Sequence, residues 1–194
     1  WVKTFSAKSK ILPKKVYSIP NNIQEFISGQ VSPHAKLYKT SITKNIEFPF
    51  KVNYTDTILY DISLLNAKRV AYYNQALAYY LIDRPGNSTT TALNKKSIND
   101  LIIVWLSIFK QTLNNQQGIN RIMMYHLYCL FEGILDTLSH HSLKFYKYNF
   151  SKKIDVLILN LQKYGDVIAP CINKSNSLKK KLMFRKLMNP NSCK

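Results

Sequence analysis

The sequence predicts a mainly α-helical protein: a small helical bundle with an antiparallel helix hairpin, an extended basic N-terminal arm and a basic C-terminal tail. Between residues 57 and 164, apolar side chains recur every three or four positions, which is the spacing of a helix face. No strand pattern is strong, and strand, if present, is expected at Ile46–Tyr54 or in the last 25 residues. The charge of +18 lies almost entirely at the two ends. We therefore expect an arm over 1–52, a helical domain over 53–172 and a tail over 173–194.

The arm, residues 1–52, shows no sustained period. We expect it to be extended, with one short helix around Asn22–Ser28. Nine lysines against two acids give it a net charge of +7, so we expect it to become ordered only against a partner that supplies negative charge. Proline interrupts helical structure, and four prolines divide this segment: Pro13, Pro20, Pro33 and Pro49.

The first helix of the bundle is predicted over Thr57–Asp83, where residues such as Ile58, Ile62 and Leu65 repeat with a helical spacing. Arg84-Pro85-Gly86 is expected to end it, because proline cannot continue a helix and glycine permits the following turn.

The predicted helices Ile98–Asn115 and Ile119–Leu138 form the hairpin, because only the short break at Asn114–Gly118 separates them. Ser97 is expected to be the N-cap of the first helix, with Asp100 in the capping-box position. This helix is apolar almost all round, as buried helices are. The second helix carries an apolar stripe made of Ile119, Ile122, Met123, Leu127, Leu130, Phe131, Ile134 and Leu138.

A fourth helix is predicted over Lys152–Tyr164. Gly165 stands where a C-cap belongs, and Pro170 follows as a helix stop. The apolar face of this helix consists of Ile154, Leu157, Ile158 and Leu161.

Composition excludes several classes of protein. The longest uncharged apolar stretches fall short of the roughly 18 residues that cross a bilayer, so we expect no membrane-spanning segment. Three cysteines without a CxxC pair argue against a disulfide scaffold.

The last 54 residues, 141–194, hold twelve basic residues against two acids, for +10. Two basic ends around a nearly neutral middle favour nucleic acid as the partner over an anionic membrane.

No catalytic motif is present: the chain lacks a Gly-rich phosphate loop, GxSxG, HExxH and paired carboxylates. We therefore expect no enzyme and no cofactor. His126 and Cys129 lie one helical turn apart, and Cys171 and Cys193 would complete a metal site on paper. Structural zinc normally uses tightly paired ligands, so we expect a buried histidine and cysteine and no metal.

Two segments, Lys144–Lys153 and Lys174–Lys186, interleave cations with aromatic residues. Lysine neutralises phosphates, and aromatic rings stack on unpaired bases. For Phe145 and Phe150, stacking and core packing both stay open. The predicted phosphate contacts are Lys144, Lys147, Lys152, Lys153, Lys179, Lys180, Lys181, Arg185 and Lys186, and in the arm Lys8, Lys10, Lys14 and Lys15.

The stretch Asp100–Ile172 resembles the ribosomal protein seven family of the small subunit. The matching parts read DLIIVWLSIFKQTLNNQQG, INRIMMYHLYCLFEGILDTL, SHHSLKFYKYNF and SKKIDVLILNLQKYGDVIAP. Gly118 matches the family's turn glycine, and Tyr128–Leu135 matches its second-helix core. The third helix and its exit are matched from Asp155 to Pro170. The family's Arg-Arg-Gly-Gly hairpin has no counterpart here, and its place would be taken by Asn173–Arg185.

This resemblance implies an rRNA-binding protein of the small-subunit head that nucleates folding of the 3′ domain of the RNA. Its partners would be ribosomal RNA and neighbouring ribosomal proteins, with no small-molecule substrate. The chain has 24 lysines against four arginines and is crowded with Asn, Ile and Tyr. These residues share A/T-rich codons, which favours a mitochondrial ribosome in the matrix.

Two alternatives remain open. A viral nucleocapsid or matrix protein would use the same charge layout to coat a genome or an anionic membrane in a virion. A secreted helical bundle with a basic tail would be marked by glycans on Asn53 or Asn87, or by a Cys171–Cys193 disulfide.

Overall fold

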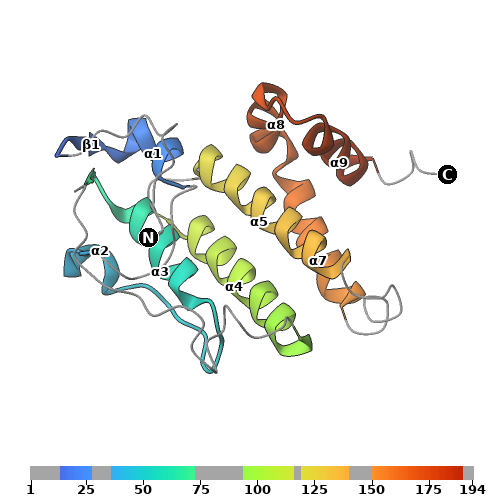
Figure 1. Cartoon of the computed structure of the whole chain (residues 1–194), viewed down its shortest axis with the longest axis horizontal. Helices are drawn as coiled ribbons and strands as arrows, with labels where there is room; N and C mark the ends of the chain where they lie inside the picture. Colours follow the sequence, from blue (N-terminus) through green and yellow to red (C-terminus); the bar gives the residue numbers. More distant parts are fainter. Residues whose placement is uncertain (1–13, 28–35, 73–93, 116–118, 140–149, 190–194) are drawn as a thin grey trace, which may run out of the picture. The chain divides into compact units, whose positions relative to one another are not determined.

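The computed structural model describes residues 14–27, 36–72, 94–115, 119–139 and 150–189. Within these ranges the protein is mainly helical, with eight helices and one two-stranded sheet, which confirms the predicted fold class (Figure 1). None of the described helices is both long and apolar enough to cross a bilayer. The chain forms two compact units that meet between residues 116 and 117, and each is described separately below.

The first unit begins with a short antiparallel sheet. Strand β1 (Val16–Ser18) pairs with β2 (Arg69–Ala71), with Tyr17 opposite Val70. The Lys14 amide donates to the Tyr72 carbonyl at 2.8 Å, which extends the pairing by a further hydrogen bond. This sheet joins residues 14–18 to a segment more than 50 positions later, so it fixes this part of the predicted arm within the unit.

Helix α3 (Thr55–Asn66) packs against α1 (Ile19–Ile27), α2 (Thr40–Thr43) and α4 (Lys95–Leu113). Successive turns of α3 bury Ile58, Ile62 and Leu65. The Tyr60 hydroxyl donates to the Phe26 carbonyl at 2.5 Å, which ties α3 to the end of α1.

The expectation of an extended arm is wrong for its described part. A short helix is present, but α1 begins three residues earlier than predicted and buries Ile19, Ile23, Phe26 and Ile27. These four side chains share one face of a nine-residue helix, a pattern too short to stand out among the prolines. Burial of that face accounts for the order of this segment without a charged partner. The predicted boundary at residue 52 accordingly falls inside the first unit.

The predicted helix Thr57–Asp83 is also wrong in extent, because α3 ends at Asn66 and β2 follows. Strand was expected at Ile46–Tyr54 or in the last 25 residues, and neither segment contains β1 or β2. The pairing of β1 with β2 depends on residues far apart in the chain, so a local pattern cannot reveal it. Residues 73–83, with Arg84-Pro85-Gly86, lie outside the described residues.

The start of α4 differs from the prediction as well. The helix begins at Lys95, and the Asn94 side chain accepts from the Ser97 amide at 2.9 Å, so Asn94 is the N-cap. Asp100 is buried and accepts from the Asn53 amide at 3.1 Å and from Lys96 at 2.5 Å. Its carboxylate thus holds the loop before α3 instead of closing a capping box.

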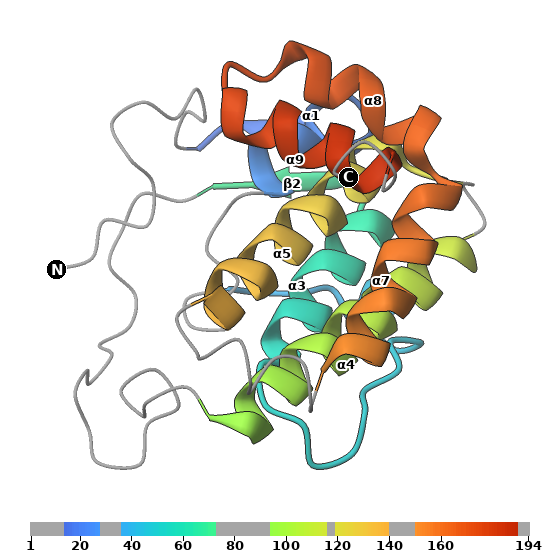
Figure 2. The same cartoon turned by 90° about the vertical axis from the view of Figure 1, so that its right-hand side faces the viewer.

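The second unit contains α5 (Arg121–Ser139), α7 (Ser151–Lys163), α8 (Gly165–Lys174) and α9 (Leu178–Met188). Helix α5 packs closely on α8, and α9 packs on both α7 and α8 (Figure 2). Asn120 caps α5 by accepting from the amides of Ile122 and Met123. The buried side chains of this unit include Met123, Met124, Leu127, Tyr128, Phe131, Ile134, Leu138, Ile154, Leu157, Leu161, Ile168, Ile172, Phe184 and Leu187.

Helices α5 and α7 agree with prediction to within two residues at each end. On α5 the expected stripe is buried except for Ile119, which precedes the helix and is 47% exposed, and the half-buried Ile122 and Leu130. On α7 only Ile158 of the expected face is not fully buried. Helices α4 and α5 belong to different units, so their antiparallel hairpin stays a prediction.

The described part of the chain after α7 departs from the prediction in three ways. Gly165 does not cap α7 but opens α8, at a point where an added Cβ would collide with the Met188 side chain. Pro170 lies inside α8 and removes one helical hydrogen bond without ending the helix. The predicted tail contains α9, which is anchored by buried Phe184 and Leu187. The boundary expected at residue 172 therefore falls inside the second unit.

Candidate nucleic-acid interface

Helix α9 carries the densest positive charge of the described chain. Five of its eleven residues are Lys or Arg, and none is acidic. Arg185 and Lys186 lie in the last turn, where the helix dipole favours cations. The first turn is different, because three consecutive lysines stand where the dipole favours acids. Local helix stability therefore does not account for these lysines.

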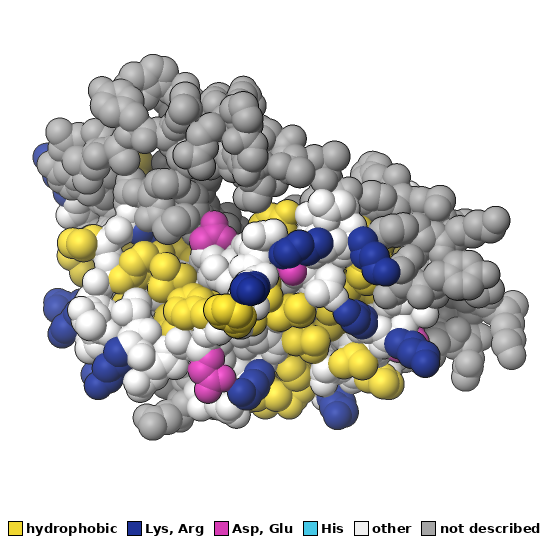
Figure 3. Space-filling model, turned by 90° about the horizontal axis from the view of Figure 1, so that it is seen from below, with side chains coloured by type: hydrophobic (Ala, Val, Ile, Leu, Met, Phe, Trp, Pro, Cys, Tyr) yellow, Lys and Arg dark blue, Asp and Glu magenta, His cyan; other side chains and the backbone are white. Residues whose placement is uncertain are grey.

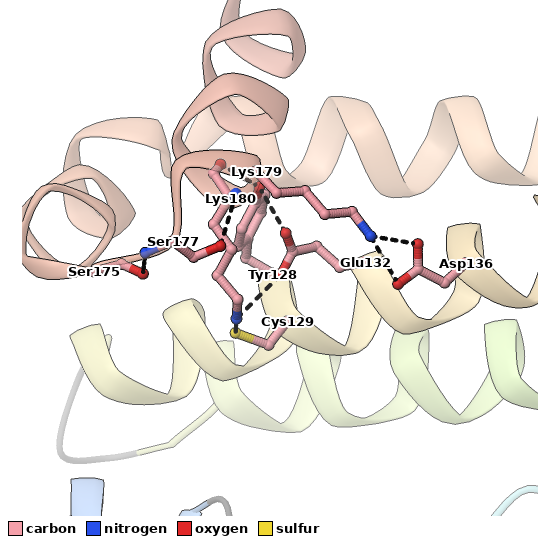
Figure 4. A network of polar contacts seen from close by, with 8 residues as sticks. All are labelled: Tyr128, Cys129, Glu132, Asp136, Ser175, Ser177, Lys179 and Lys180. Carbon is pink, nitrogen blue, oxygen red and sulfur yellow. Dashed lines mark hydrogen bonds and ion pairs between the residues drawn. The ribbon is translucent and has the colours of Figure 1, made fainter.

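Two acids of α5 compensate for part of this first turn (Figure 4). Asp136 pairs with Lys179 at 3.1 Å in an exposed ion pair. Glu132 pairs with Lys180 at 3.2 Å, and here the carboxylate is largely buried. The Ser177 hydroxyl accepts from the Lys180 amide and caps α9 at the same point. The start of α9 is thus fixed to α5 by two ion pairs, and its first turn is held by its own N-cap.

Lys180 is partly enclosed, with a side chain 30% exposed. Its Nζ lies 3.0 Å from the Cys129 Sγ and 5.4 Å from the centre of the Tyr125 ring. Burial alone would lower the pKa of Lys180, but its contacts with Cys129 and Glu132 outweigh burial and raise the pKa. The Lys180 ammonium was predicted to contact phosphate, whereas the structure turns it toward α5.

Tyr128 adds a further link between the two helices. Its hydroxyl donates to the Lys180 carbonyl at 3.1 Å, and its ring meets the Phe184 ring edge-on at 5.6 Å. Burial, together with the nearby Glu132 carboxylate, raises the pKa of Tyr128, so the hydroxyl keeps the proton that it donates. Phe184 is therefore a core residue, and the buried Phe150, 2% exposed, is one as well.

Three predicted contacts on α9 remain open to solvent. Lys181 is half-buried, and Arg185 and Lys186 are exposed. Within the part of the chain that the structure describes, none of the three makes an ion pair. Among the residues that the structure describes, no ion pair has to break for these side chains to meet phosphate.

The other predicted contacts are spread over separate elements. Lys152 and Lys153 are exposed in the first turn of α7. Lys14 and Lys15 are exposed before β1 in the first unit, with the Lys15 ammonium 5.3 Å from the Tyr17 ring centre. Lys8, Lys10, Lys144 and Lys147 lie outside the described residues, as does Phe145.

Two basic residues that were not among the predicted phosphate contacts belong to the same unit as α9. Arg121 opens α5, Lys174 ends α8, and both are exposed. Burial raises the pKa of the Cys171 thiol on α8, and the positive charges of Arg121 and Lys174 oppose that rise. Both cations are therefore close enough to Cys171 to favour its charged form. Arg121 stands apart from any lysine run, so the sequence offered no signal for it, whereas Lys174 opens the cation-and-aromatic segment Lys174–Lys186.

Figure 3 shows how the described cations are distributed on one face of the protein. On the face shown in Figure 3, Lys and Arg side chains are scattered among apolar ones. Among the described residues, no three His, Cys, Asp or Glu side chains gather as a metal site would require. The arrangement suits a ligand with distributed negative charge.

Comparisons with family models, with curated proteins and with solved structures found no match to this chain.

Proposed function

We propose that this chain is a structural RNA-binding protein of a ribosome, in the small subunit of a mitochondrial ribosome, where it neutralises and organises rRNA. The observation that carries the proposal is α9: it presents Lys181, Arg185 and Lys186 to solvent while Lys179, Lys180 and Tyr128 fix the helix to α5. The helix is held in place, and its outward cations lack ion-pair partners within the described chain.

The mechanism is electrostatic docking on the RNA backbone. Each cation that meets a phosphate releases condensed counterions, which drives binding and makes it sensitive to salt. Contacts of this kind fix position and orientation and carry little sequence information. A fixed helix loses less conformational entropy on binding than a loose tail would. Anchoring through α5 therefore favours binding by α9.

The ribosomal assignment is supported by the resemblance of Asp100–Ile172 to the protein seven family and by the A/T-rich codon bias of the composition. We propose rRNA and neighbouring ribosomal proteins as its partners and no catalytic role. Sedimentation of the native protein tests this step: it should co-migrate with a small ribosomal subunit through a high-salt gradient. Migration in particles that lack ribosomal RNA would contradict it.

The RNA-binding step is tested by a triple variant, Lys181→Gln, Arg185→Gln and Lys186→Gln, titrated with structured RNA at several salt concentrations. Binding should weaken, and the slope of log K against log salt should fall by about 0.7–0.9 for each phosphate that the variant no longer neutralises. The matched control removes three exposed first-unit lysines: Lys39→Gln, Lys44→Gln and Lys95→Gln. Equal weakening in both variants, or binding by the wild type that does not change with salt, would contradict the proposed role of α9.

A further inference from the structure

Helix α7 has an apolar pair on its outer side as well as an apolar core face. Ile154, Leu157 and Leu161 are fully buried, whereas Val156 is 45% exposed and Leu159 is 58% exposed. Lys152, Val156, Leu159 and Lys163 follow one another at intervals of four, three and four residues. Side chains with this spacing lie along one face of a helix. We call these four residues the α7 stripe.

We infer that the α7 stripe is a docking surface for an acidic amphipathic helix of a partner protein. This inference goes beyond the proposed contact with RNA, which rests on α9.

Charge and spacing both indicate this occupant. The exposed side of α7 holds Lys152, Lys153 and Lys163 against Asp155, a net charge of +2. A lysine stands one turn before and one turn after the aliphatic pair. A partner helix with aliphatic residues at the same spacing would pack its ridges against the stripe, and acids flanking them would meet both lysines. The surface is complementary to such a helix at each of its four positions.

The same features disfavour the other occupants. A second copy of the chain would bring Lys152 and Lys163 against the same lysines in either orientation, which is repulsive. An RNA backbone would satisfy the lysines but would leave Val156 and Leu159 without an apolar partner. Helix α9 also exposes two leucines, Leu178 and Leu182, but Leu178 is the first residue of that helix, so no lysine stands one turn before this pair on α9. These leucines therefore lack the flanking arrangement of the α7 stripe and serve as the matched control.

The test uses the full chain and a synthetic peptide of three heptads, with Leu at the core positions and Glu flanking them. A scrambled peptide of the same composition serves as the second ligand. The variant Val156→Gln with Leu159→Gln should bind the ordered peptide at least tenfold more weakly. The control variant, Leu178→Gln with Leu182→Gln, should bind it as the wild type does. Circular dichroism should show unchanged helix content for both variants.

A charge exchange keeps the inference testable even if the first variant fails to fold. The variant Lys152→Glu with Lys163→Glu should no longer bind the acidic peptide and should bind instead a peptide in which Lys replaces each flanking Glu. Equal binding of ordered and scrambled peptides, or unchanged affinity in the Val156/Leu159 variant, would overturn the inference. So would self-association or RNA affinity that falls selectively in that variant, since these point to a second copy or to RNA. The peptide experiment does not depend on RNA binding: its outcome stands even if the Lys181/Arg185/Lys186 variant binds RNA as the wild type does.

Discussion

At the scale of single residues, three consecutive lysines have three different roles. Lys179 forms an exposed ion pair with Asp136, Lys180 lies against Cys129 and Glu132, and Lys181 makes no ion pair within the described chain. The sequence interpretation treated all three as phosphate contacts, because a run of like residues does not show which of them faces a neighbouring helix. That information depends on Glu132 and Asp136, about 45 positions earlier, and on how α5 and α9 pack.

The variant Lys180→Met tests the anchoring role. It removes a partly buried ion pair and leaves the Glu132 carboxylate, which is 11% exposed, without that partner. We expect unfolding in urea to show a destabilisation of about 1–2 kcal/mol, discounted for partial solvent exposure. Lys179→Met removes only an exposed pair, and its effect should stay within about 0.5 kcal/mol. Equal destabilisation in the two variants would contradict the anchoring role.

The same ion pair predicts a dependence on pH. Contacts with Cys129 and Glu132 raise the pKa of Lys180 above its ordinary value of 10.5. A raised pKa stabilises the folded state fully below pH 10.5, and this contribution disappears as the pH rises through the folded-state pKa. The stability difference between wild type and Lys180→Met should therefore be constant near neutral pH and shrink above 10.5. A difference that grows with alkaline pH would rule out this contribution.

At the scale of elements, a helical period was sufficient where a helix buries a long face. Helices α5 and α7 were predicted to within two residues, since Met123, Leu127 and Phe131 on one and Ile154, Leu157 and Leu161 on the other repeat over several turns. The period failed where an element is short or depends on a distant partner. Strand β2 needs β1, and the buried face of α1 spans only nine residues.

The start of α4 offers a test at this scale, because the sequence pattern predicted Ser97 as its N-cap and the structure has Asn94 there. Asn94→Ala removes the side chain that accepts from the Ser97 amide, and we expect a destabilisation of about 1 kcal/mol in chemical unfolding. Ser97→Ala leaves that amide and its acceptor in place, so its cost should be smaller. If Ser97→Ala destabilises the protein more than Asn94→Ala does, Ser97 and not Asn94 is the N-cap.

At the scale of the whole molecule, the sequence revealed the high net positive charge. The division into two basic ends and a neutral middle, however, does not match the two compact units. Both units are basic: residues 1–116 hold fifteen basic residues against six acids, and residues 117–194 hold thirteen against four, or +9 each. The ion pairs of the described chain include Lys96–Asp100, Lys110–Glu47, Lys179–Asp136 and Lys180–Glu132. Because cations exceed acids in each unit, repulsion among them opposes folding, and a polyanion would relieve it.

Salt separates this repulsion from the stabilising ion pairs, because it screens both. If repulsion dominates, raising NaCl from about 10 mM to about 150 mM should raise the Tm, with about 2–4 °C for each kcal/mol of repulsion removed. Adding inorganic polyphosphate at constant ionic strength should raise the Tm further, since a ligand that binds only the folded state stabilises it by mass action. A Tm that falls with salt would show that the ion pairs outweigh the repulsion. In that case the charge of +18 would not require a polyanionic partner, and RNA binding would rest on α9 alone.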